Sequence, residues 1–169
     1  MITPDFCRQM ASYNLWQNEQ IRQALEDQPA NLLSEDRGAF FGSILGTLSH
    51  LLWGDLMWMA RFEAGLDAPG GTLAESARMV SDFRRWQKMR RETDKTLCAW
   101  AAALPEEALQ GDLVWFSAAA QKEMRSPLGL CVAHMFNHQT HHRGQVHAMM
   151  TAAQLRAPVS DLFLMPEAA

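Results

Sequence analysis

The chain has 169 residues, of which 48% are apolar and 20% are charged. This length suits one domain with a core of ordinary size, and we expect a single domain over residues 1–169. Lysine and arginine number 15 against 19 aspartate and glutamate residues, so the net charge is −4 with neutral histidines. This acidic balance argues against nucleic-acid binding, which requires a basic surface.

The three cysteines, Cys7, Cys98 and Cys131, are far apart and form no CxxC pair. The sequence therefore predicts neither a disulfide framework nor a thiolate zinc site, and reduced thiols favour the cytoplasm. The N-terminus has no basic and apolar signal pattern. The most apolar stretch, residues 44–60, is interrupted by His50 and Asp55, so we expect no membrane span and a soluble cytoplasmic protein.

Four long helices are predicted in chain order. The first begins after Thr3, which provides an N-cap before a proline at the first helical position, and it ends at Pro29. The second begins near residues 39–42 and ends at Gly65, a candidate C′ glycine. Its apolar residues occupy more than one face, which indicates a buried helix.

The third helix is predicted over residues 72–104, where apolar residues alternate at spacings of four and three. Arg90 and Thr93 interrupt this apolar seam. Either the helix leaves its neighbour there, or Arg90 extends into a polar cavity, and the sequence leaves both open. The opposite face carries a basic stripe, which we interpret as a solvated surface; it consists of Arg84, Lys88, Arg91 and Lys95.

A short β-hairpin is predicted over residues 112–125. Ser126 and Pro127 are then expected to be the N-cap and first residue of the last helix, which extends to about Gln154. We expect the tail after Pro158 to pack back through residues 162–164. The fold class predicted is all-α, a four-helix bundle with a short hairpin before the last long helix.

Histidines gather in the last predicted helix, which contains five of the six in the chain. His134, His138 and His142 lie on one helix face, and His147 lies on the opposite side. Histidines four residues apart can share a metal ion, whereas His134 and His142 are about 12 Å apart along the axis. A metal would therefore take either His138 with His142 or His134 with His138, and a further ligand from another helix.

His50 is the one histidine outside this group, and it lies between Gly46 and Gly54 on the second predicted helix. Small residues there would let another helix or a ligand approach closely. A single buried histidine is more often a hydrogen-bonded core residue than a ligand, and paired histidines occur on helix surfaces by chance. Bundle cores do hold metals through ligands from facing helices, so both interpretations stay open from the residues alone.

Three segments resemble a known family. Residues 138–145, His-Gln-Thr-His-His-Arg-Gly-Gln, resemble the HxxxHRGQ signature of the DinB / YfiT-like family of metal-dependent enzymes. Residues 13–18 resemble that family's aromatic-Asn-x-Trp-x-Asn pattern in the first helix. Residues 47–55 resemble its second-helix segment around the first metal ligand. The segments occur in the family's order, and the hairpin before the last helix also fits.

The resemblance implies that His50, His138 and His142 bind one divalent metal ion, with zinc or nickel favoured. His134, His141 and Gln145 would then line the pocket or support the ligands by hydrogen bonds. Arg143 lies about 140° around the helix from His138, away from this face, so we expect a structural role for it. Gly144 is expected to permit close helix packing.

The same resemblance implies a metal-dependent enzyme that acts on a small molecule, as a hydrolase or as an S-transferase that uses a low-molecular-weight thiol. It also implies a homodimer. No general base is evident, since Asp55 lies about 140° around the helix from His50 and nothing assigns such a role to Glu19. The alternative is a non-catalytic metal-binding protein of the stress response. DNA binding is suggested only by the family's association with DNA damage, and the acidic charge opposes it.

Overall fold

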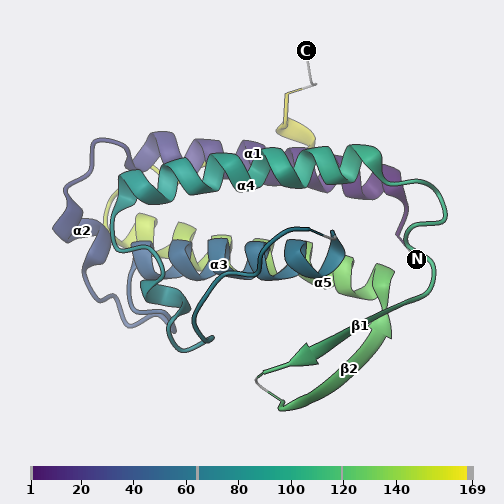
Figure 1. The fold of residues 1–169 in the computed structure, drawn as a ribbon. Helices are drawn as coiled ribbons and strands as arrows, with labels where there is room; N and C mark the ends of the chain where they lie inside the picture. Colours follow the sequence, from purple (N-terminus) through teal and green to yellow (C-terminus); the bar gives the residue numbers. More distant parts are fainter. Residues whose placement is uncertain (1, 64, 119, 167–169) are drawn as a thin grey trace.

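The computed structural model describes residues 2–63, 65–118 and 120–166. Figure 1 shows two layers of long helices, with α1 and α4 in one layer and α3 and α5 in the other. The long helices are α1 (Pro4–Leu25), α3 (Ile44–Phe62), α4 (Phe83–Ala103) and α5 (Leu128–Ala152). The smaller elements are α2 (Ala30–Ser34), η1 (Ser76–Arg78), β1 (Asp112–Ser117), β2 (Lys122–Pro127) and η2 (Leu162–Leu164). The predicted helical bundle with a hairpin before the last helix is confirmed.

The bundle is held by two groups of buried apolar side chains. One group includes Leu48, Leu52 and Trp86 between α3 and α4. The other includes Leu97 and Phe136, from α4 and α5. Helix α1 packs on α4 and α3 packs on α5, so the apolar stripes of all four helices face one interior. No helix among the described residues is long and apolar enough to cross a membrane.

The first helix begins where the sequence predicts. The hydroxyl of Thr3 accepts a hydrogen bond from the backbone N–H of Phe6, and Pro4 is the first helical residue. The helix ends at Leu25 rather than at Pro29. Pro29 is instead the N-cap of the short helix α2, which the sequence analysis did not predict because five residues are too few to show helical periodicity.

Helix α3 is shorter than predicted at both ends. Ser43 is its N-cap and accepts a hydrogen bond from the backbone N–H of Gly46. The helix ends at Phe62 with Glu63 as the C-cap. Gly65 does have a positive φ of 95°, but it lies two residues after the C-cap Glu63 rather than one, so its prediction as the C′ residue is wrong. The buried character predicted for this helix is confirmed, because most of its side chains are buried.

The predicted start of the third helix is wrong by eleven residues. Helix α4 begins at Phe83, after Asp82, whose carboxylate accepts from the backbone N–H of Arg85. The residues before Asp82 form a loop that crosses α3 and contains η1. Ser49 of α3 anchors this loop, since its hydroxyl donates to the carbonyl of Ser76 and accepts from the backbone N–H of Val80. The loop therefore lies directly over the middle of α3.

The hairpin is present, with β1 and β2 antiparallel and Trp115 opposite Met124. Strand β2 continues through Ser126 to Pro127. Ser126 is thus paired with Leu113 in the sheet and is not a helix cap. The predicted N-cap is therefore wrong by one residue, because Pro127 is the N-cap and α5 begins one residue later.

The tail after α5 packs back differently from the prediction. Leu162, Phe163 and Leu164 are exposed, with 41%, 84% and 54% of their surfaces accessible. The tail is held instead by its backbone carbonyls. Tyr13 of α1 donates its hydroxyl hydrogen to the carbonyl of Ser160, and the Gln17 side chain donates to that of Val159. The prediction of apolar packing there is wrong.

A buried polar layer distinguishes the two alternatives that the sequence left open for Arg90. Its guanidinium is buried and pairs with the carboxylates of Asp55 and Asp94. Gln139 of α5 donates to the other oxygen of Asp55, and Asn18 of α1 donates to Asp94. Arg90 therefore extends into a polar interior that joins all four helices. The basic stripe on the outer face of α4 is exposed, as predicted.

Candidate metal centre

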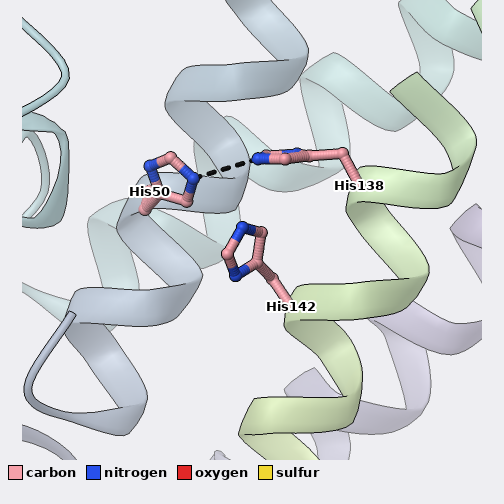
Figure 2. Close-up of side chains that lie close together, drawn as sticks. All are labelled: His50, His138 and His142. Carbon is pink, nitrogen blue, oxygen red and sulfur yellow. Dashed lines mark hydrogen bonds between the residues drawn. The ribbon is translucent and has the colours of Figure 1, made fainter. Parts of the chain in front are cut away.

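Three histidines from two helices meet at one point in the bundle. His50 comes from α3, and His138 and His142 come from successive turns of α5 (Figure 2). Each offers one ring nitrogen, and these atoms lie within 4.8 Å of one another. The Nε2 atoms of His50 and His138 are 3.1 Å apart. The sequence-predicted trio is therefore brought together by the fold.

The close approach of the two helices depends on Gly54, one turn after His50. The ring of His138 lies directly against the backbone of Gly54. A Cβ built at this position would be 3.0 Å from the Cε1 atom of that ring and 3.5 Å from its Nδ1 atom. A side chain at position 54 would displace the imidazole, so the glycine fixes how near His138 can come to His50.

The loop before α4 orients the ring of His50. The hydroxyl of Ser76 lies 2.9 Å from Nδ1 of His50 and donates its own hydrogen to the carbonyl of Leu73, 2.6 Å away. Because that hydrogen is used, the serine oxygen must accept from an Nδ1–H. The proton of neutral His50 thus lies on Nδ1, and the lone pair of Nε2 points into the histidine cluster.

Gln145 has the same effect on His142. Its side-chain oxygen lies 2.8 Å from Nδ1 of His142, and its amide nitrogen lies 3.3 Å from Nε2 of His141. A carbonyl oxygen can only accept, so Nδ1 of His142 carries the hydrogen. The Nε2 lone pair of His142 is then free to coordinate. Gln145 therefore contacts His142, and its role in supporting a metal ligand stays a prediction.

Aromatic side chains enclose the cluster on the side of α3. The ring of Phe41 stacks on that of His50, with centroids 3.7 Å apart, and its edge meets His142 at 5.4 Å. The ring of Trp53 is also nearly parallel to that of His50, with ring centroids 6.3 Å apart. These contacts restrict the orientation of the His50 ring.

Burial keeps the three imidazoles neutral at physiological pH. Burial, together with the neighbouring His142, lowers the pKa of His50 to about 4. Burial likewise lowers the pKa of His138 to about 3, with added repulsion from His142 and His50. Burial also lowers the pKa of His142. A neutral imidazole is the form that binds a metal.

The donor set fits one small divalent ion. Two facing Nε2 atoms at 3.1 Å place lone pairs against each other unless a cation or a proton lies between them. A tetrahedral ion with bonds of about 2.0–2.1 Å holds its nitrogen ligands roughly 3.3 Å apart, close to this spacing. The buried Nδ1 of His138 has no hydrogen-bond partner in the described part of the chain. Three histidines could therefore hold one metal ion here.

Comparison with known proteins agrees with this geometry. A sequence model described as the DinB family matches residues 1–168. The chain belongs to the DinB family. It is also 24% identical over 157 residues to the protein named DinB of Bacillus subtilis (strain 168), an alignment that covers 93% of this chain and 91% of that one. The resemblance found in the sequence is thereby confirmed.

The remaining candidates of this DinB family chain occupy different positions. His134 is exposed one turn before His138, with ring centroids 5.9 Å apart. His141 is exposed beside His142, at 4.8 Å between ring centroids. Both are therefore exposed neighbours of the cluster on α5. His147 is exposed on another face of α5.

Arg143 and Gly144 are two further positions of the DinB signature. Arg143 is buried on the far side of α5 and donates a hydrogen bond to the side chain of Asn14 in α1. This agrees with the structural role expected of it. Gly144 has no atom within 4 Å of the position a Cβ would take. The expectation that Gly144 permits close helix packing is therefore wrong, and that function belongs to Gly54.

Neither carboxylate considered as a base is available to the cluster. Asp55 is bound by Arg90 and Gln139 in the buried polar layer. Glu19 is bound by Arg22 on α1, which lowers the pKa of the carboxyl group. The sequence analysis missed Ser76 and Phe41, which both contact His50 from loops. No periodicity marks a loop contact, so one sequence offered no signal for either residue.

Proposed function

We propose that this protein is a metal-dependent enzyme with one divalent ion, zinc or nickel, held by His50, His138 and His142. The observation that carries the proposal is the convergence of three ring nitrogens within 4.8 Å, two of them with the proton fixed on the opposite nitrogen. Three protein ligands leave at least one coordination position for water or substrate, which is typical of catalytic rather than structural zinc sites.

The reaction we propose is hydrolysis, or S-transfer from a low-molecular-weight thiol, on a small-molecule substrate. A metal in this position would acidify a bound water or thiol and polarise a substrate oxygen. The protein's own side chains contribute by holding the ligand rings in position. Ser76 and Gln145 hold the ligand rings by hydrogen bonds, Phe41 covers His50, and exposed His134 and His141 flank the approach.

A second candidate is a non-catalytic metal-binding protein of the stress response. It is favoured by the commitment of Asp55 to Arg90 and Gln139, because the nearest carboxylate on α3 then cannot serve as a general base. The two candidates share the metal site and differ in turnover. A metal-activated water or thiol can act as nucleophile without a separate base, so we place the enzyme first.

The experiment is elemental analysis of the protein purified without an affinity tag or added metal. We expect one zinc or nickel ion per chain in the wild type and a stoichiometry near zero in His138→Ala. His147→Ala is the matched control, because that histidine is exposed on another face of α5. Undiminished metal in His138→Ala would show that the ligand assignment is wrong.

Turnover then separates the two candidates. A panel of esters, amides and electrophiles paired with cellular thiols is assayed with the metal-loaded protein and with protein treated with chelator. Metal-dependent turnover that is absent in His138→Ala supports the enzyme. Metal binding without turnover on any member of the panel supports the non-catalytic candidate.

The family resemblance also supports a homodimer, which we include in the proposal. Equilibrium sedimentation is the direct test, since the chain mass is 19.0 kDa. A single species at that mass would contradict the dimer.

A further inference from the structure

A continuous row of side chains leads from the histidine cluster toward the hairpin. Arg61 follows His50 by eleven residues on α3, which places it on the same helix face, about 16 Å further along the axis. The rings of His138 and His134 are 5.9 Å apart, and those of His134 and Trp58 are 5.3 Å apart. Trp58 in turn contacts Arg61.

Two tryptophans hold the guanidinium of Arg61. Its central carbon lies 4.6 Å from the ring centroid of Trp58 and 5.4 Å from that of Trp115. The two indole rings also meet edge to face, with centroids 5.9 Å apart. Trp115 lies on the half-buried face of β1, whereas the neighbouring Val114 and Phe116 are exposed. The hairpin thus presents this one ring to α3.

Arg61 has no counter-ion in the described part of the chain. None of the ion pairs formed there includes it. Burial lowers the pKa of its guanidinium, and the one neighbour that acts in the opposite direction is the weakly acidic thiol of Cys131. Arg22 and Arg90 are paired with carboxylates. The buried Arg143 has no carboxylate partner but donates a hydrogen bond to the side chain of Asn14, whereas Arg61 has neither kind of contact among the described residues.

A half-buried cation without a neighbouring anion lies in an unfavourable electrostatic environment. Loss of hydration destabilises the charged guanidinium. The cation–π contacts with the aromatic faces offset only part of that loss. A carboxylate would complete the site, because the planar guanidinium offers paired donors that match its two oxygens. The indole rings would cover the apolar body of the same molecule.

We propose that Arg61, Trp58 and Trp115 form a subsite that binds the carboxylate of an elongated small molecule whose other end reaches the histidine cluster. The substrate class is then an organic acid with its reactive group about 16 Å or somewhat less from its carboxylate, given the eleven-residue separation of His50 and Arg61. This inference rests on the proposed function, since it extends the same site toward the hairpin. Arg61 is a specificity-determining residue in this arrangement.

The test uses linear thiols that differ only in their far end. Mercaptoundecanoate carries a thiol and a carboxylate at opposite ends of a chain long enough to span the row, and mercaptoundecanol replaces the carboxylate with an alcohol. Mercaptopropionate and mercaptopropanol form a short pair that cannot span it. Calorimetric titration of the full zinc-loaded chain with all four probes measures the preference for acid over alcohol at each length.

We expect the long acid to bind about tenfold more tightly than the long alcohol, as one charge-assisted contact provides, and the short pair to show no preference. Arg61→Gln should abolish the long-chain preference. Arg84→Gln, which removes an equal charge from an exposed position on α4, should retain it. The zinc affinity of Arg61→Gln should equal that of the wild type.

The outcomes separate this inference from the proposed function. A wild type without any preference for the long acid overturns the inference, and so does a preference that persists in Arg61→Gln. Neither result affects the metal site, which is judged by zinc stoichiometry alone. A preference lost in Arg61→Gln, with zinc stoichiometry intact, supports the subsite.

Discussion

Ser76 and His50 are joined across 26 residues of sequence by a hydrogen bond of 2.9 Å between the serine hydroxyl and Nδ1 of the imidazole. The bond connects the loop before α4 to the ligand helix α3. It also fixes the proton of His50 on the nitrogen that faces away from His138. We predict that Ser76→Ala lowers zinc affinity by about tenfold, the usual effect of removing a hydrogen bond that orients a histidine ligand.

Competition with a chromophoric zinc chelator measures this change. Ser81→Ala provides the control, because Ser81 is exposed in the same loop. The loop itself should stay in place in Ser76→Ala, since Ser49 binds the backbone carbonyl at position 76. Equal zinc affinity in Ser76→Ala and the wild type would mean that the serine does not orient the ligand.

Gly54→Ala is predicted to separate metal binding from folding stability. Alanine favours a helix interior over glycine by about 1 kcal/mol, so the metal-free protein should be as stable as the wild type or more stable. The new methyl group, however, would lie 3.0 Å from Cε1 of His138 and displace the ring. We expect zinc affinity to fall by roughly tenfold or more, as for other displaced ligands.

Gly144→Ala is the matched control on α5. No atom lies within 4 Å of its added methyl group, so it should gain a similar helical stability of up to about 1 kcal/mol and keep full zinc affinity. Urea denaturation and zinc competition, applied to both variants, give the two readouts. Wild-type zinc affinity in Gly54→Ala would refute the idea that this contact positions His138.

The parts of the fold that sequence could predict are those with local or periodic signals. Helix α1 was placed by the cap at Thr3 and the proline after it, and the histidine face of α5 followed from spacings of four residues. The start of α4 could not be placed in this way. Apolar residues before Asp82 continue the helical spacing, yet the chain there folds across α3 and is tied to Ser49.

The candidate site likewise contains residues with local sequence signals and residues without them. His138 and His142 are neighbours on one helix, so their proximity could be predicted from spacing alone. A ligand role for His50 remained one of two open interpretations from the residues alone, because nothing local links it to α5, and the family resemblance was needed to assign it as a ligand. The hydrogen-bond partners that orient the histidine rings also differ in their separation along the sequence. Gln145 lies three residues from His142 and could be predicted, whereas Ser76 is long-range and could not.

The buried polar layer leads to a stability prediction. Arg90→Leu would remove the cation that lies between Asp55 and Asp94 and leave both carboxylates buried. Breaking a buried ion pair from one side costs about 3–5 kcal/mol, and we expect a loss in this range from urea denaturation at neutral pH. Arg84→Leu, exposed on the same helix, should change stability by less than about 0.5 kcal/mol. Similar stabilities for the two variants would contradict this account.

The histidine cluster also predicts how the stability of the metal-free protein depends on pH. Burial lowers the pKa of His50 to about 4 and that of His138 to about 3 in the folded chain, whereas an unfolded histidine has a pKa near 6.5. Below about pH 6.5 the unfolded chain therefore binds protons that the folded chain excludes. The contribution of these residues to stability is complete above that pH and is lost progressively as the pH falls toward 4.

Urea denaturation of chelator-treated protein from about pH 7 to about pH 5 tests this dependence. The free energy of unfolding should decrease steadily over that interval in the wild type. In the double variant His50→Gln, His138→Gln the decrease should be smaller, because the groups that titrate differently in the two states are gone. His147→Gln, at an exposed position, should behave as the wild type does. A double variant with the wild-type slope would show that other groups control the pH dependence.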